Sequence, residues 1–123
     1  MNLINISYKD TKVFISSHKV AWHPILIDVL VWIHEHFNDL GRVIITESWR
    51  PKRHKNDLHG FDLLRAFDLR SWEFKIPDRV EAEINRNWQY DPARPTKMVC
   101  FYHDSGEGKH FHIQVHKNTR LRI

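Results

Sequence analysis

The residues of this sequence that could carry chemistry are its histidines and one aspartate that stands between them. The chain of 123 residues contains ten histidines, and histidine is the commonest metal ligand and the usual acid or base near neutral pH. From His110 to His116, polar and apolar residues alternate. In a strand this pattern places His110, His112, Gln114 and His116 on one face. The pair His110 and His112 is therefore a candidate set of metal ligands.

A carboxylate and a further histidine can join this pair. Residues 65–70 alternate and predict a short strand, in which Asp68 faces away from the apolar Phe67 and Leu69. A carboxylate there is costly to desolvate unless it is paired, for example with a neighbouring arginine, or bound to a metal. His59 lies nine positions earlier, across a loop that can fold back toward the strand. Two histidines and one carboxylate, with a water as fourth ligand, are typical of a catalytic zinc site.

The elements that must position these residues follow from hydrophobic spacing and from proline and glycine. Pro24 precedes the apolar stretch 25–37 and Gly41 follows it, which is typical of a helix. A second, amphipathic helix is predicted over residues 77–88. Strands are predicted at residues 42–50, 65–70, 98–102 and 110–116, and loops or turns at residues 51–60, 91–95 and 104–109.

These elements predict one α+β domain over residues 1–123. In this fold a small antiparallel sheet carries helices on one face and leaves a polar face open. Residues 98–116 form a hairpin closed by a glycine-containing turn. The candidate metal ligands would lie on the open face of the sheet.

The composition excludes several classes of protein. Cys100 is the only cysteine, so neither an intramolecular disulfide nor a cysteine-based zinc knuckle is possible. The first residues lack the pattern of a signal peptide, and the apolar stretch 25–37 is too short and too charged to span a bilayer. We therefore expect a monomer without a transmembrane segment, made in the cytoplasm. The formal net charge of +4 favours an anionic partner, such as a nucleic acid, a cell-wall polymer or a membrane surface.

The order of the candidate residues resembles a known family. The zinc D-alanyl-D-alanine carboxypeptidases and L-alanyl-D-glutamate endopeptidases of the Hedgehog/DD-peptidase fold carry Ser-x-His-x-x-Gly-x-Ala-x-Asp, followed by a C-terminal histidine. Residues 57–60 and 65–70 resemble the two halves of that motif, and residues 110–112 resemble its C-terminal part in the His-x-His variant. Residues 46–50 resemble the strand that supplies an arginine. The resemblance covers about residues 42–116.

The resemblance implies a ligand set and an anion-binding residue. It implies a Zn²⁺ ion held by His59, Asp68 and His112. It also implies that Arg50 binds a substrate carboxylate or the developing oxyanion, for which the donors of a guanidinium are suited.

The base is implied less directly, because the chain departs from the family pattern. The usual glutamate, three residues before the last ligand, falls on Lys109. His110 is therefore the expected catalytic base, and Glu107 is the alternative. Asp57 replaces the usual serine, Leu64 replaces the usual glycine, and the spacing from histidine to aspartate is two residues longer than the common pattern.

The function implied is zinc-dependent cleavage of peptidoglycan stem peptides, by an endolysin-like endopeptidase or by a D,D-carboxypeptidase. A phage or prophage lysis enzyme of this kind would leave the cytoplasm by other means and act on the cell wall, and its positive charge would favour an anionic wall.

Three alternatives remain open. The His-x-His pattern also fits metal-dependent endonucleases that nick DNA, but these require a tyrosine on a following helix, and no tyrosine follows residue 112. An iron oxygenase also uses two histidines and a carboxylate, but its close His-x-Asp pair is missing. The third alternative is a non-catalytic module of the same fold that binds metal or the cell wall.

Overall fold

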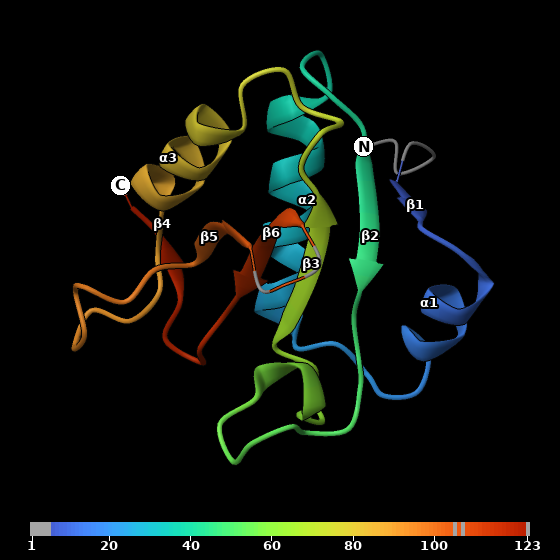
Figure 1. Ribbon diagram of the computed structural model, residues 1–123. Coiled ribbons are helices and arrows are strands. Elements are labelled where there is room, and N and C mark those ends of the chain that lie inside the picture. Colours follow the sequence, from blue (N-terminus) through green and yellow to red (C-terminus); the bar gives the residue numbers. More distant parts are fainter. Residues whose placement is uncertain (1–5, 105, 107, 123) are drawn as a thin grey trace.

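The computed structural model describes residues 6–104, 106 and 108–122. Over these residues the chain is a mixed α+β structure with a five-stranded and a two-stranded sheet (Figure 1), which confirms the predicted class. The helices are α1 (Thr11–Ser16), α2 (Pro24–Phe37) and α3 (Pro77–Asn87), with a 3₁₀ turn, η1, at Leu58–Gly60. The strands are β1 (Ile6–Tyr8), β2 (Val43–Glu47), β3 (Ala66–Arg70), β4 (Trp88–Gln89), β5 (Cys100–Asp104), β6 (Lys109–Gln114) and β7 (Arg120–Leu121).

The five-stranded sheet has the order β1-β2-β3-β6-β5, and β4 pairs separately with β7. From β2 to β5 the neighbouring strands are antiparallel, as predicted. However, β1 pairs parallel with β2, so the prediction of a wholly antiparallel sheet was wrong at this edge. The physical reason is the connection, because α1 and α2 form a crossover that brings the chain back to the same end of the sheet.

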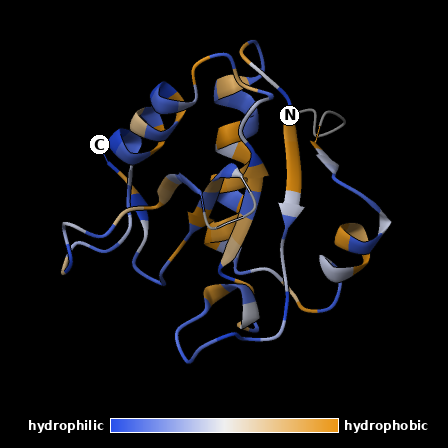
Figure 2. Ribbon diagram, viewed as in Figure 1, coloured by the Kyte–Doolittle hydropathy of each residue, from blue (hydrophilic) through white to orange (hydrophobic). Residues whose placement is uncertain are grey.

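Helix α2 covers one face of the sheet and provides much of the core. Pro24 occupies its first turn, and Nδ1 of His23 accepts a hydrogen bond from the backbone N–H of Ile25 at 3.1 Å. Its buried side chains pack against inward-facing residues of the strands, among them Phe67 and Phe111. Figure 2 shows the hydrophobic residues concentrated on α2 and on the strands in front of it. None of the described helices is long and apolar enough to span a bilayer.

Helix α3 lies along β5, the edge strand of the sheet, and occupies its outer backbone groups. The side-chain amide of Asn85 accepts from the backbone N–H of Cys100 at 2.9 Å and donates to the carbonyl of the same residue at 2.8 Å. The carboxylate of Glu81 accepts from the backbone N–H of Tyr102 at 2.6 Å. These contacts block edge-to-edge pairing with another strand.

The boundaries of the C-terminal hairpin differ from the prediction. β5 covers Cys100–Asp104 rather than residues 98–102, and β6 ends at Gln114 rather than at His116. The backbone N–H of His116 donates to Oγ1 of Thr119 at 2.8 Å, so a turn replaces the continued strand. His116 lies beyond the end of β6 and faces Asp91, with Nδ1 3.7 Å from Oδ2.

Candidate metal centre

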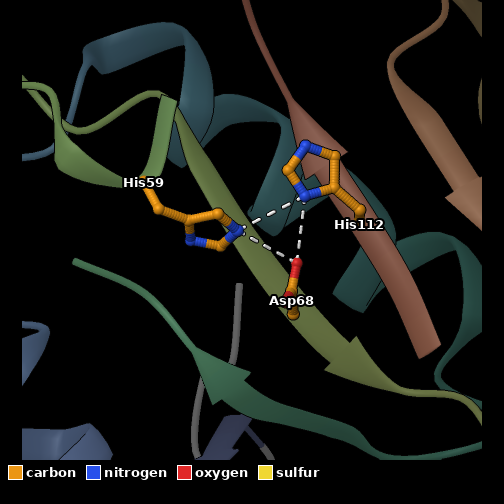
Figure 3. Close-up of side chains that lie close together, drawn as sticks. All are labelled: His59, Asp68 and His112. Carbon is orange, nitrogen blue, oxygen red and sulfur yellow. Dashed lines mark hydrogen bonds and ion pairs between the residues drawn. The ribbon is translucent and has the colours of Figure 1, made fainter. Parts of the chain in front are cut away.

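Three side chains from different elements meet on the face of the sheet opposite α2 (Figure 3). His59 comes from η1, Asp68 from β3 and His112 from β6. Nε2 of His59 lies 3.2 Å from Oδ1 of Asp68 and 3.3 Å from Nδ1 of His112. Nδ1 of His112 lies 3.1 Å from the same Asp68 oxygen. The three atoms form a nearly equilateral triangle, which could hold a metal ion.

The register of the sheet places two members of this triangle. Asp68 on β3 stands directly opposite His112 on β6, and directly opposed residues of antiparallel strands point to the same face. Their neighbours Phe67, Leu69 and Phe111 point to the other face and are buried in the core. Packing of these apolar side chains therefore fixes Asp68 and His112 on the open face.

The loop between β2 and β3 brings His59 to the strands. Asp57 caps η1, where its Oδ1 accepts a hydrogen bond from the backbone N–H of His59 at 3.2 Å. The carbonyl of His59 accepts from the backbone N–H of Arg50 at 3.0 Å, which ties the turn to the end of β2. His59 is almost completely buried, with 2 % of its surface exposed. Its ring therefore has little freedom to leave the triangle.

Hydrogen bonds on the far side of each imidazole determine its tautomer. Nδ1 of His59 lies 2.7 Å from the backbone carbonyl of Ser48. Because a carbonyl only accepts, this nitrogen carries the proton and Nε2 presents its lone pair to Asp68.

His112 is oriented by Gln114 in the same way. The amide nitrogen of Gln114 donates to the carbonyl of Met98 at 2.9 Å, so its oxygen Oε1 faces Nε2 of His112 at 3.2 Å. Nε2 is therefore the donor, and Nδ1 presents its lone pair to the triangle. Two imidazole lone pairs and a carboxylate oxygen then point at one another, an arrangement that a bound cation, or a shared proton in its place, stabilises.

The two histidines lower the pKa of the Asp68 carboxyl. Burial by itself raises the pKa of Asp68. Without a metal, protons on the His112 and His59 nitrogens that face the carboxylate, in place of the cation, supply hydrogen bonds and positive charge that outweigh burial. The pKa of the carboxyl is therefore held far below its ordinary value of 3.8. Arg65 and Arg70 do not pair with Asp68: Arg65 bonds to Val115 and Tyr90, and Arg70 lies nearest Glu73.

Comparison with known proteins adds no relative. No protein-family model, curated protein or solved structure matches the chain.

His110 lies next to the triangle. Its Nε2 is 3.6 Å from Oδ2 of Asp68, the oxygen that does not face His59 or His112. Its Nδ1 lies 3.1 Å from the carbonyl of Gly108, to which it donates. The structure therefore brings His110 beside the three predicted ligands. Glu107, the alternative base, lies outside the described residues.

Arg50 is engaged in ion pairs at the base of the loop. Its Nη1 lies 3.1 Å from Oε2 of Glu47, and its Nη2 lies 3.3 Å from both oxygens of Asp57. Burial raises the pKa of Asp57, but hydrogen bonds from the backbone of Arg53 and His59 and the charge of Arg50 lower it, with a net decrease. In this structure Arg50 stabilises the turn that carries His59.

The alternation of residues 110–116 places Gln114 on the face of His112, but it does not predict a role for Gln114. Its position two residues after a candidate ligand, in a strand, was the available signal. The carbonyl of Ser48 had no signal, because every residue has a backbone carbonyl. Hydroxyl contacts hold this segment: Oγ of Ser48 lies 2.6 Å from Oγ of Ser17, at the end of α1.

Removing the acceptor on His112 should weaken metal binding. We expect Gln114→Leu to lower the affinity for a divalent metal about tenfold to a hundredfold, because Nδ1 of His112 would no longer be held as the free nitrogen. Gln114→Glu retains an acceptor oxygen and should keep most of the affinity. Competition titration against a chromogenic chelator measures both, and equal affinities for the wild type and Gln114→Leu would contradict the assigned tautomer.

Proposed function

We propose that this chain is a zinc-dependent peptidase that cleaves the stem peptides of peptidoglycan. The observation that carries the proposal is the triangle of lone pairs formed by His59, Asp68 and His112 on the open face of the sheet. Each imidazole is held in the tautomer that a metal ligand requires. A buried structural histidine would not need this arrangement.

The donor set supports zinc among the common metals. Donor atoms bound tetrahedrally at about 2.0–2.1 Å are about 3.3 Å apart, and the three separations here are 3.1, 3.2 and 3.3 Å. Two nitrogen donors disfavour calcium and magnesium, which prefer oxygen ligands. Three protein ligands leave a fourth position for water or substrate, which is the pattern of catalytic sites.

His110 is suited to move the proton. When bound, a zinc ion acidifies water and polarises a carbonyl. Nδ1 of His110 donates to the carbonyl of Gly108, which leaves Nε2 free to accept a proton beside Asp68 and later deliver it to the leaving amine. The ring is partly accessible, with 16 % of the side chain exposed, so it can meet both water and substrate.

The substrate class rests on the sequence resemblance. Arg50, three residues after the end of β2, then His59, Asp68 and His112, follow one another in the order of the peptidoglycan peptidases. The net charge of +4 favours association with an anionic wall. By the same resemblance we place the site of action at the cell wall, after release from the cell, and the specific fold with the Hedgehog/DD-peptidase group.

The nicking endonuclease is less well supported, because it needs a tyrosine nucleophile near the metal. Tyr8 contacts Phe14, Tyr90 contacts His116, and Tyr102 packs on Phe111. All three tyrosines therefore contact residues outside the triangle.

Metal content and hydrolysis of purified peptidoglycan test the proposal together. We expect the wild type to bind about one zinc per chain and to release new peptide ends, and His112→Ala to lose both properties. A wild type that binds no metal and releases no peptide ends would refute the proposal. Bound metal without hydrolysis would favour the non-catalytic module, and nicking of single-stranded DNA would favour the nuclease.

A further inference from the structure

We propose that Arg70, supported by Trp72, binds a carboxylate of the substrate beside the metal centre. This inference rests on the proposed peptidase function, and it names the residue that selects the substrate. It also moves the anion-binding role away from Arg50, to which the sequence resemblance assigned it.

The position of Arg70 on the sheet brings it close to the reacting bond. Arg70 follows Asp68 by two residues on β3 and therefore shares its face of the sheet. It stands directly opposite His110 on β6, the proposed base. Residues two apart on a strand are separated by about 7 Å. Arg70 thus lies one row along the open face from the metal ligands.

The guanidinium of Arg70 rests on the ring of an exposed tryptophan. Its central carbon lies 4.9 Å from the centroid of the Trp72 ring, within the range of a cation–π contact. Trp72 has 75 % of its surface exposed, although burying a tryptophan is strongly favourable. This contact orients the guanidinium, and 24 % of the Arg70 side chain remains exposed to a ligand.

The charge of Arg70 is only weakly paired. Among the described residues, Glu73 is the one carboxylate within ion-pair distance, at 3.9 Å, and no hydrogen bond there engages the guanidinium. Its donors are therefore available for a bidentate contact with a carboxylate.

Arg50 differs in the pairing of its charge, although its Nε and Nη1 are buried without a hydrogen-bond partner among the described residues. Its donors contact two carboxylates at 3.1–3.3 Å, and one of them, Asp57, is 4 % exposed. Arg50, Arg53, Glu47 and Asp57 together carry no net charge. A substrate carboxylate at Arg50 would have to displace an ion pair that holds the turn of His59.

The geometry also limits the kind of ligand. A peptide spans about 3.5 Å per residue when extended, so a bond at the metal centre and a carboxylate at Arg70 are separated by about one or two residues. The ligand is therefore a peptide with a carboxylate close to the bond that is cut. The carboxylate can be the C-terminal group of the peptide or an acidic side chain.

The binding of three probes to the zinc-free protein distinguishes a C-terminal carboxylate from a side-chain carboxylate. They are acetyl-D-alanyl-D-alanine, which has a terminal carboxylate, its C-terminal amide, which has none, and acetyl-L-alanyl-D-glutamic acid amidated at its α-carboxyl group, which keeps only the side-chain carboxylate. We expect at least one acid to bind the wild type about tenfold more tightly than the amide, as charge-assisted hydrogen bonds predict. Calorimetry measures the affinities, and the fluorescence of Trp72, identified by comparison with Trp72→Phe, reports contact at Arg70.

Variants then test whether the side chain of Arg70 causes the preference for the acid over the amide. Arg70→Gln should remove the preference for the acid, and Arg70→Lys should retain part of it, because the charge remains without the planar fork. Arg79→Gln, at an exposed position on α3, is the matched control and should retain it fully. No preference in the wild type, or an unchanged preference in folded Arg70→Gln, would overturn the inference.

Failure of this inference is distinguishable from failure of the proposed function. If the wild type hydrolyses peptidoglycan and Arg70→Gln still prefers the acid, only the role of Arg70 is refuted. If the wild type binds no zinc and Arg70→Gln loses the preference, the carboxylate site stands and the peptidase proposal is refuted.

Discussion

Asp68→Asn is expected to lower the affinity for zinc by more than about a hundredfold. Loss of an outer partner of a ligand typically lowers metal affinity tenfold to a hundredfold, and Asp68 supplies the only negative charge among the three ligand atoms. The asparagine has nearly the same shape, so the register of β3 with β6 should be unchanged. The loss of zinc affinity can therefore be attributed to the missing charge and lone pair of the carboxylate.

The same substitution should also change the stability of the zinc-free protein. Hydrogen bonds and charge from His112 and His59 outweigh burial and hold the pKa of Asp68 far below 3.8. A carboxyl whose pKa is lower in the folded than in the unfolded protein stabilises the fold above its ordinary pKa, and this contribution is lost as the pH falls below that value. Asp68→Asn should lower the free energy of unfolding by about 1–3 kcal/mol at pH 7, and the difference should shrink below pH 3.8.

Chelator competition measures the zinc affinity, and urea unfolding between pH 2 and pH 7 measures the stability. Asp39→Asn is a matched control at an exposed position after α2, and it should change neither quantity. Unchanged zinc affinity in Asp68→Asn would exclude Asp68 as a ligand. A difference in stability that is independent of pH would exclude the ion pair as its cause.

The ligand set was predictable because strand alternation and core packing determine it together. Asp68 and His112 each alternate with apolar neighbours, and Phe67, Phe111 and Ile113 are fully buried. Once these side chains enter the core, the polar ones must occupy the opposite face. His59 was less constrained, since a loop does not fix a side chain by periodicity, and its expected position rested on a loop that can fold back toward Asp68 and on the family resemblance.

The parts that escaped prediction depend on contacts distant in sequence. β1 has three residues, too few for alternation to predict a strand, and its parallel pairing with β2 becomes favourable only when both strands are present. The turn at His116 is likewise formed by Thr119, whose hydroxyl donates to the carbonyl of Tyr90 at 2.7 Å. Such hydrogen bonds leave no periodic pattern in the sequence, so the end of β6 was placed two residues too late.

The role of Arg50 shows why a motif does not determine a function by itself. Its place before the first ligand agrees with an anion-binding residue, but Glu47 and Asp57 compete for the same donors. Asp57 stands where the resembling family has serine, and a serine would carry no such charge. The departure from the motif and the engagement of Arg50 therefore have one cause.

His110→Ala is expected to separate catalysis from metal binding. The variant should bind zinc with nearly wild-type affinity, because His59, Asp68 and His112 remain, and should lose about a hundredfold to ten-thousandfold of the rate of hydrolysis. Metal content and the release of peptide ends from peptidoglycan are measured on the same preparation. His103→Ala is a useful control, since its exposed ring lies 4.9 Å from the ring of His110 and outside the triangle, and it should retain most of the activity.

The comparison with Glu107→Ala decides which residue is the base. If His110 accepts the proton, His110→Ala loses most of the rate at unchanged zinc content, while Glu107→Ala keeps the rate. The opposite pattern would assign the proton transfer to Glu107 and leave His110 a structural partner of Asp68. Loss of zinc in His110→Ala would instead make His110 a ligand. This outcome would require a change of the triangle, because Nε2 of His110 faces a different oxygen of Asp68.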